Sequence, residues 1–297
     1  MHFPLDREIV VALGGGHGLA SSLRALVLAG ECPIGVVSVA DDGGSSGRLR
    51  EDFGLQPPGD IRKCLVALAE AESVWTSVFS FRFESGELAG HSLGNLIIAG
   101  LNEVTGDFGK AIKLAQDLIG VKGILYPSSN VPITLEALVG NRVVQGQVNI
   151  MHTSGIDSVY TNPGNPEVAA EVVDALLAAK KIVVGPGSLY TSVLAVLAIP
   201  KISDAISASS AKKVYVVNLK PQDRETSGFN IADHIRALAK HKFVPDVILA
   251  DTAYMELGDA RELCQSMHSQ LVICQLADKF GILHDPVLLA DAFKEYG

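Results

Sequence analysis

A glycine-rich turn near the N-terminus contains residue types that can bind a phosphate group. It reads Gly14-Gly15-Gly16-His17-Gly18 and lies between a short apolar run rich in β-branched residues and a segment with leucines at helical spacing. Backbone N–H groups at a helix start point outward, and the helix dipole adds partial positive charge there. We therefore predict that a phosphate contacts this turn, with these candidate ligands: Gly15, Gly16, His17 and Gly18.

A second polar turn begins at Asp41. Residues 41–48 read Asp-Asp-Gly-Gly-Ser-Ser-Gly-Arg and contain no apolar side chain. Asp41 follows Gly18 by 23 residues, close to the separation at which a Rossmann acid accepts a hydrogen bond from a ribose hydroxyl. If the chain turns directly afterwards, Asp41 and Asp42 could together hold a divalent cation such as Mg²⁺. The candidate ligands in this turn are Asp41, Asp42, Ser45, Ser46 and Arg48.

The glycine spacing departs from two familiar nucleotide-binding motifs. Gly14-x-Gly16 is followed by Leu19 where a third glycine would complete the dinucleotide fingerprint, and no Gly-Lys-Ser/Thr sequence completes a Walker loop. The pattern predicts a phosphate or nucleotide site, but it identifies neither NAD nor ATP as the ligand.

Later segments contribute further candidates. Asp60 is predicted to cap a helix whose first turn carries Arg62 and Lys63, and cations at a helix start indicate a nearby anion. His91 and Asn95 lie where another periodic helix begins. A second glycine turn, at 185–188, follows a strand and precedes an apolar helix, and an asparagine ends the next strand. These segments add five predicted ligand-binding residues: Asp60, Asn95, Gly187, Ser188 and Asn218.

The elements that must position these side chains follow a β-α-β pattern. A strand at 9–13, a helix at 19–28 and a strand at 34–40 form a mononucleotide-binding half. We predict a single Rossmann-like α/β domain over residues 1–297, with a mostly parallel sheet, helices on both faces and a β-rich insertion or sheet edge at 121–160. Because the carboxyl ends of parallel strands share one edge, we expect both glycine turns to face one crevice.

Composition argues against several other classes of protein. The 297 residues are 48% hydrophobic and carry a formal net charge of −9, which disfavours nucleic-acid binding. No apolar stretch approaches the roughly 18 residues of a membrane span, so no membrane insertion is expected, and the N-terminus lacks the apolar region of a signal peptide. The four cysteines are scattered, as in reducing compartments. We expect a cytoplasmic protein, with a homodimer as the commonest assembly.

Taken together, the motifs resemble those of the bacterial gluconeogenesis-factor family. The resemblance covers roughly residues 9–290. This family shares its fold with the 2-phospho-L-lactate transferases of deazaflavin-cofactor synthesis, so the resemblance implies a CofD-like domain. The matching segments are residues 12–19, 39–50 and 57–62, His91-Ser92-Leu93-Gly94-Asn95-Leu96, and residues 185–192.

The resemblance implies a cytoplasmic regulator that binds the nucleotide-sugar UDP-N-acetylglucosamine and affects carbon metabolism, cell-wall synthesis and cell shape. For such a regulator the one candidate cofactor is Mg²⁺, and the candidate protein partners are a second copy of the chain and a separate regulatory protein. The alternative is a Mg²⁺-dependent transferase related to the phospholactate enzymes, with His17 or His91 as the proton carrier. A third hypothesis, an NAD-binding protein without catalysis, is disfavoured by the glycine spacing.

Three positions depart from the family pattern. The first turn carries His17 where the family usually has threonine, and Asp223-Arg224 stand where the family usually has Pro-Gly before Glu-Thr. Leu283 replaces the arginine that the family tends to carry before His-Asp-Pro. A substitute for this missing positive charge could come from Arg224.

Overall fold

Seven parallel strands form the central sheet. The computed structural model describes residues 8–70 and 73–297, apart from the side chains of residues 46 and 51–53. The strand order is β10-β9-β8-β7-β1-β2-β3, and all neighbouring pairs are parallel. The strands are β1 (Val10–Gly14), β2 (Ile34–Val37), β3 (Ile124–Pro127), β7 (Lys181–Val184), β8 (Lys212–Val216), β9 (Val247–Ala250) and β10 (Gln270–Ile273).

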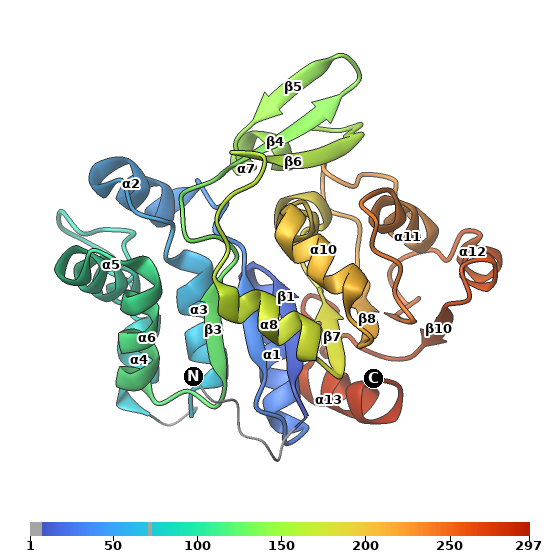
Figure 1. The fold of residues 1–297 in the computed structure, drawn as a ribbon, viewed down its shortest axis with the longest axis horizontal. Helices are drawn as coiled ribbons and strands as arrows, with labels where there is room; N and C mark the ends of the chain where they lie inside the picture. The colour runs from blue at the N-terminus through green and yellow to red at the C-terminus, as the bar shows by residue number, and fades with distance from the viewer. Residues whose placement is uncertain (1–7, 71–72) are drawn as a thin grey trace.

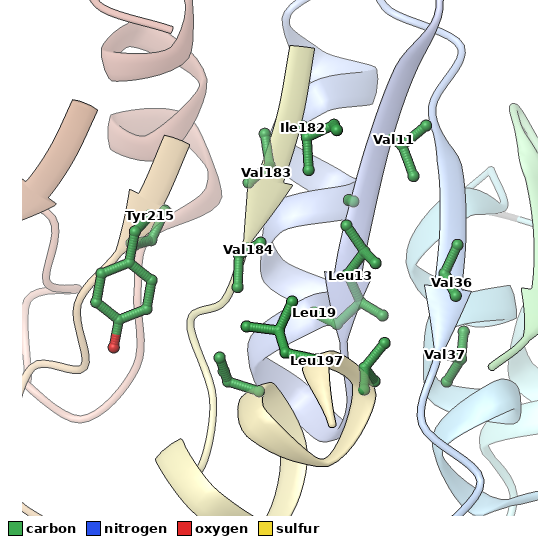
Figure 2. Packing of buried hydrophobic residues seen from close by; sticks show 14 of the residues in the cluster. Val11, Leu13, Leu19, Val36, Val37, Ile182, Val183, Val184, Leu197 and Tyr215 are labelled. Carbon is green, nitrogen blue, oxygen red and sulfur yellow. The ribbon is translucent and has the colours of Figure 1, made fainter. Parts of the chain in front are cut away.

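Continuous apolar sequence explains why these short segments become central strands. β1, β2 and β9 are buried along their whole length, and a parallel strand covered on both faces favours such uninterrupted β-branched runs. Leu13 of β1 lies opposite Val36 of β2 on one side and Val184 of β7 on the other. Figure 2 shows these side chains in the middle of the core.

The strand order places a topological switch point between β1 and β7. From β1 the chain moves outward through β2 to β3, then returns to pair β7 with the other side of β1 and continues to β10. Connections on the two sides of β1 therefore run in opposite directions. In a doubly wound sheet this arrangement opens a crevice beyond the carboxyl ends of the two diverging strands. The predicted Rossmann-like α/β fold is confirmed.

Helices cover both faces of the sheet. α1 (Gly16–Leu28) packs against α3 (Gly59–Leu68) and α13 (Pro286–Glu295), whereas α8 (Ala170–Ala178) packs against α10 (Pro200–Ala208) in front of the sheet in Figure 1. Right-handed crossovers in opposite directions place the two groups on opposite faces. The other helices are α2 (Gly44–Phe53), α4 (Val74–Ser80), α5 (Leu93–Thr105), α6 (Phe108–Ile119), the π-helical turn η1 (Leu189–Val193), α9 (Leu194–Leu197), α11 (Ile231–Lys240) and α12 (Ala260–Ser266).

A three-stranded antiparallel sheet projects from the top of the molecule in Figure 1. It comprises β4 (Thr134–Val139), β5 (Arg142–Gln145) and β6 (Ser158–Asn162), in the order β5-β4-β6. The predicted β-rich segment at 121–160 thus contributes both to this small sheet and to an edge of the main sheet. Residues 124–127 pair with β2 as the edge strand of the main sheet, because their apolar run fits the core there.

A short helix interrupts the predicted β-rich segment after β5. Helix α7 (Gln147–Met151) follows β5 directly. The carboxylate of Asp42 accepts hydrogen bonds from the backbone N–H groups of Gln147 (2.9 Å) and Val148 (2.9 Å). A distant carboxylate thereby stabilises this helix start, which alternation in the local sequence does not reveal.

Within residues 8–70 and 73–297, no single helix is long and apolar enough to cross a membrane. The segments Leu189–Leu197 and Pro200–Ala208 reach the length and composition of a membrane span only when taken together, and the chain bends by 70° between them.

Candidate functional site

A crevice of about 510 Å³ lies at the carboxyl ends of β1 and β7. Both glycine turns contribute to its wall, as does the loop that follows β8. The prediction that the two turns face one crevice agrees with this arrangement. The lining residues are Gly15, Gly16, His17, Gly18, Ser21, Asp41, Asp60, Lys63, Gln147, Met151, Pro186, Gly187, Ser188, Ser192, Asn218, Leu219, Lys220, Pro221, Gln222, Ile282, Leu283 and His284.

The first glycine turn forms the start of α1 rather than a separate loop. Helix α1 begins at Gly16, earlier than predicted, with Gly15 in an extended conformation as its N-cap. Because glycine has no side chain, the N-cap Gly15 offers the first N–H groups of the helix no side-chain acceptor. Gly16 has φ of +62°, a conformation that favours glycine. This helix start is open toward the crevice.

Close packing between the two turns requires a glycine at position 18. A Cβ added to Gly18 would lie 2.5 Å from the carbonyl carbon of Pro186 and would overlap the carbonyl oxygen of the same residue. The contact holds the ends of β1 and β7 against each other. Gly18 is therefore explained by backbone packing as well as by its place beside the crevice.

The second glycine turn is braced by side chains from the loop after β8. The N–H of Gly187 donates to Oδ1 of Asn218 (2.9 Å), and Nε2 of Gln222 donates to Oγ of Ser188 (2.6 Å). The predicted ligands Gly187, Ser188 and Asn218 do line the crevice. Because part of their hydrogen-bonding capacity is already used inside the protein, they shape the wall and present fewer free groups.

A buried carboxylate occupies the helix start that follows the second turn. Oε1 of Glu225 accepts from the N–H groups of Tyr190 (2.6 Å) and Thr191 (3.2 Å), and its Oε2 accepts from the Thr191 hydroxyl (3.1 Å). Glu225 is 1% exposed. Burial raises the pKa of Glu225, and these hydrogen bonds oppose that shift. The carboxylate of Glu225 thus compensates the partial positive charge of the helix start after β7.

Asp60 and Lys63 place one carboxylate and one cation at the first turn. Asp60 lies inside the first turn of α3, whose N-cap is Pro58, so the predicted capping role is wrong. Its Oδ1 accepts from Nζ of Lys63 at 2.9 Å, and its Oδ2 lies 2.7 Å from where a Cβ of Gly15 would be. Lys63 also lines the crevice. An anion at the turn would meet the ammonium group together with the open N–H groups.

His17 stands at the same place with a lowered pKa. Burial is the main cause, the positive charge of Lys63 adds to it, and the Asp60 carboxylate opposes it. The imidazole is therefore neutral near pH 7, so it offers a hydrogen-bond donor or acceptor to a ligand without a full positive charge.

The adjacent carboxylates of the polar turn do not act together. Asp41 lines the crevice, and its Oδ1 accepts from the N–H of Gly43 (3.0 Å). Asp42 is not among the lining residues, and both of its oxygens accept from α7. The prediction that Asp41 and Asp42 jointly hold a cation does not fit this geometry. Asp42 is better explained as a structural residue, whereas Asp41 remains a ligand candidate together with Asp60.

Three other predicted ligands lie outside the crevice lining. Ser45 and Asn95 form a hydrogen-bonded cluster with His91, and Arg48 donates to the backbone of Ala89. None of these side chains appears among the lining residues. Ser46 lies in α2, and its side chain falls outside the part of the chain that the structure describes. The polar turn is thus divided between the crevice and a separate cluster.

The rim of the crevice includes a position at which the sequence departs from the family pattern. Leu283, in place of the family arginine, lines the crevice beside Ile282, and both are largely exposed. Arg224 is absent from the lining, whereas Lys220 is present, with Nζ 4.7 Å from the centre of the Tyr254 ring. The positive charge on this part of the crevice wall therefore comes from Lys220 and not from Arg224.

Sequence reasoning missed three further lining residues. Nε2–H of His284 donates to the carbonyl of Val217 (3.0 Å), and burial lowers the pKa of His284 to about 4. Gln222 and Lys220 come from the polar loop after β8. Their closeness in sequence to Asn218 was the available signal. For His284 the available signal was its place directly after Leu283 in the family's His-Asp-Pro sequence, although it reaches the crevice from after β10, at the far end of the chain.

Two carboxylates of the crevice could hold a cation if a bound phosphorylated ligand supplied the remaining oxygen atoms. Among the residues that the structure describes, no group of three or more His, Cys, Asp or Glu side chains could hold a metal ion. Asp41 and Asp60 line the same crevice. Mg²⁺ is commonly held by one or two carboxylates plus phosphate oxygens and water, so this donor set fits Mg²⁺ when a phosphorylated ligand supplies further oxygens.

Comparisons with known proteins identify chains that are similar to this one. A family model described as 2-phospho-L-lactate transferase CofD matches residues 10–277. A gluconeogenesis factor from Halalkalibacterium halodurans is 42% identical over 240 residues, which are 80% of this chain and 74% of that protein. A putative gluconeogenesis factor from Mycobacterium tuberculosis is 38% identical over 95% of this chain and 88% of its own length.

The similarity extends to the three-dimensional structure. The crystal structure of a member of the UPF0052 family from Bacillus halodurans superposes with a TM-score of 0.92 at 35% identity, covering 98% of this chain and 100% of that one. Some relatives are longer. A putative gluconeogenesis factor from Nostoc sp., 42% identical over 77% of this chain, is matched over only 51% of its own length.

Proposed function

This chain belongs to the gluconeogenesis-factor family, which is related to 2-phospho-L-lactate transferase CofD, and we propose that it is a nucleotide-sugar-binding regulator. The ligand we propose is UDP-N-acetylglucosamine, because the family resemblance of the motifs points to it. In this role the bound nucleotide-sugar controls how the protein affects carbon metabolism, cell-wall synthesis and cell shape.

One observation carries the proposal: the open start of α1 faces a crevice at the switch point of the sheet. The N-cap Gly15 has no side chain, and Lys63 lies beside the same turn. Helix-start N–H groups, the helix dipole and an ammonium group together favour a diphosphate. The neighbouring Asp60 carboxylate opposes an anion, but its Oδ1 is already paired with Lys63.

The carboxyl end of β2 supports a nucleoside beside this diphosphate. Asp41 lines the crevice shortly after β2, the strand next to β1. In dinucleotide-binding folds an acid at this position accepts from a ribose hydroxyl. The crevice then continues toward Lys220, Ile282 and Leu283. Its volume of about 510 Å³ lies within the range typical of small-molecule sites.

A second candidate function, a Mg²⁺-dependent transferase, is favoured by one observation. Asp41 and Asp60 both line the crevice that would hold the phosphates. These two carboxylates would hold the ion, which would neutralise charge on the transferred group. Lys63 and the start of α1 would orient the phosphorylated substrate, and neutral His17 could accept a proton from an attacking hydroxyl.

A thermal-shift titration tests the proposal. The protein is heated with UDP-N-acetylglucosamine, UDP, NAD or GDP, each with and without Mg²⁺. A ligand at 100 times its dissociation constant stabilises the folded state by about 2.7 kcal/mol, which corresponds to a shift of roughly 5–10 °C in a chain of this size. We expect the largest shift with the uridine nucleotide-sugar, and a measurable shift without Mg²⁺.

Other outcomes would change the assignment. A larger shift with GDP or NAD would contradict the proposed ligand. A shift that appears only with Mg²⁺ would favour the transferase, and the search would then turn to a group-transfer reaction. The variant Asp41→Asn should weaken binding of the nucleotide-sugar about tenfold without unfolding the protein, because this half-buried residue lies in a loop outside the core.

A further inference from the structure

A cluster of basic and polar side chains lies next to the crevice but outside its lining. It is built around the starts of α2 and α5. Six side chains form it, and we call them the arginine cluster: Ser45, Arg48, Arg62, Arg82, His91 and Asn95.

The three guanidinium groups of the cluster donate to backbone carbonyls, two in the segment that leads into α5 and one in α4. Arg48 Nη2 donates to Ala89 O (3.4 Å), Arg82 Nη1 to Gly90 O (2.5 Å) and Arg62 Nη1 to Phe79 O (3.3 Å). The ion pairs found in the described part of the chain involve none of these arginines. Three positive charges thus converge without a carboxylate in contact, in a protein of net charge −9.

The repulsion among these charges is visible at Arg62. Burial lowers the pKa of its guanidinium, the nearby Arg82 lowers it further, and the Asp60 carboxylate on the same helix opposes the shift. Its Nε is buried and has no hydrogen-bond partner. A bound anion would relieve both the unpaired donor and the mutual repulsion.

Polar groups at two helix starts complete the cluster. Ser45 lies in the first turn of α2, whose N-cap Gly43 has no side chain. Ser92, the N-cap of α5, donates its hydroxyl to Phe79 O rather than capping the helix. Because both helix starts lack a side-chain cap, their dipoles add partial positive charge at the same place.

A buried side chain with an unused polar atom points to a ligand at this position. Asn95 is 3% exposed, and its Nδ2 donates to Ser45 Oγ (3.4 Å), whose hydroxyl lies 3.1 Å from Nδ1 of His91. The other end of the amide, Oδ1, has no hydrogen-bond partner. An unsatisfied buried polar atom is costly. A ligand hydroxyl would satisfy it directly, and a half-turn of the amide would offer the NH₂ group to an anion.

We propose that the arginine cluster is a second anion site, separate from the crevice, and that it binds the phosphate group of a small molecule. Arginine side chains form paired hydrogen bonds with phosphate oxygens, and a serine hydroxyl and helix N–H groups are suited to the remaining ones. Arg62 and Lys63 are neighbours on α3, so the two sites are adjacent, and a ligand in each would stand side by side.

The experiment is a calorimetric titration of the full chain with inorganic phosphate at constant ionic strength. The crevice is first saturated with UDP, so that only a second site remains. We expect one phosphate per chain. Arg48→Ala should weaken its binding about tenfold, because one charge-assisted hydrogen bond to the anion is lost. Arg48 is exposed, so this variant should fold normally.

Three further variants sharpen the test. Asn95→Asp keeps the size of the side chain but adds a negative charge, so it should abolish phosphate binding, with circular dichroism confirming the fold. Arg142→Ala, at an exposed position on β5, serves as the matched control and should bind phosphate as the unaltered protein does. Lys63→Ala should also still bind phosphate at the second site, because Lys63 belongs to the crevice.

The outcomes separate this site from the proposed function. Absence of phosphate binding after UDP saturation, or binding unaffected by Arg48→Ala and Asn95→Asp, would overturn the second site. Acetate binding as tightly as phosphate would overturn the phosphate assignment. Glycerol phosphate binding more tightly than inorganic phosphate would identify a phosphate ester as the source, and the reverse would identify the free ion. Failure of UDP to bind would contradict the proposed function alone, and the same variants would then be compared without it.

Discussion

The two glycine turns look alike in sequence and differ in what they leave open. Each follows a buried strand, and each leads into a helix. After β1 the helix start has only glycine at its N-cap and faces the crevice. After β7 the corresponding N–H groups of Tyr190 and Thr191 donate to the Glu225 carboxylate.

This difference teaches that a strand–glycine–helix pattern does not by itself identify an anion site. The helix dipole favours negative charge at both starts. At the second start the protein supplies that charge itself, from a loop more than thirty residues further along the chain. At the first, the N-cap Gly15 offers the helix N–H groups no side-chain acceptor, which leaves them for a phosphorylated ligand. The predictions below test this contrast, beginning with the largest expected effect.

Replacing Gly18 by alanine should disrupt the contact that joins the two turns. The added methyl group would collide with the Pro186 backbone, which cannot move aside as a side chain can, so we expect a loss of about 3 kcal/mol in unfolding free energy. Urea unfolding measures it. Gly100→Ala is the matched control, because a Cβ there meets nothing within 4 Å and should stabilise α5 by up to about 1 kcal/mol. Equal stability of both variants would show that the turns do not depend on each other.

Replacing Glu225 by alanine should make the second turn resemble the first. Two N–H groups and one hydroxyl would lose their acceptor, and we expect a loss of about 2–3 kcal/mol in unfolding free energy. Inorganic phosphate should then restore part of the stability by binding at the open helix start. A variant that phosphate does not stabilise would show that an uncapped start is not sufficient for anion binding.

Glu225→Gln tests the charge separately. Because the folded-state pKa of Glu225 is raised above its ordinary value of 4.5, its protonation favours the folded state. This contribution is fully present below about pH 4.5 and is lost as the pH rises through the folded-state pKa. Unfolding free energies of the unaltered protein should therefore fall relative to the glutamine variant over that interval. Parallel pH profiles would contradict the raised pKa.

Lys63→Ala should weaken the first turn as an anion site without unfolding the protein. It removes the ammonium group and leaves Asp60 without its ion-pair partner. We expect about tenfold weaker binding of UDP, equivalent to about 1.4 kcal/mol, and unchanged binding of uridine, which has no phosphate. Lys110→Ala, at an exposed position on α6, is the control. Equal weakening for UDP and uridine would remove Lys63 from the phosphate site.

His17→Thr should have the smallest effect. The lowered pKa leaves the imidazole neutral near pH 7, so replacement by a hydroxyl changes a hydrogen bond but removes no charge. We expect UDP affinity to change less than about threefold at pH 7.5. A large loss of affinity would show that the imidazole contributes more than a substitute for the family hydroxyl.

Much of the fold could be predicted because its signals are local. The β-branched runs of β1 and β7, the glycines after them and the leucine periodicity of α1 each predict their element from neighbouring residues. The boundaries of an element could not be predicted where residues far away in the sequence determine them. Residues 124–127 join the main sheet and not the small one, and α7 begins where Asp42 accepts its N–H groups.

The sequence by itself determined the parallel α/β architecture, the common crevice of the two glycine turns and the glycines, Asp41, Asp60 and Lys63 around it, because these depend on periodicity, turn chemistry and position after strands. Only the tertiary structure decided which of the neighbouring polar residues line the crevice and which lie elsewhere. It placed Asp41 in the crevice and the Asp42 carboxylate at the start of α7, assigned Ser45 and Asn95 to the arginine cluster, and brought Glu225 to the second turn. The physical reason is that a buried hydrogen-bonding group takes whichever partner folding brings within about 3 Å, and local sequence does not contain that partner.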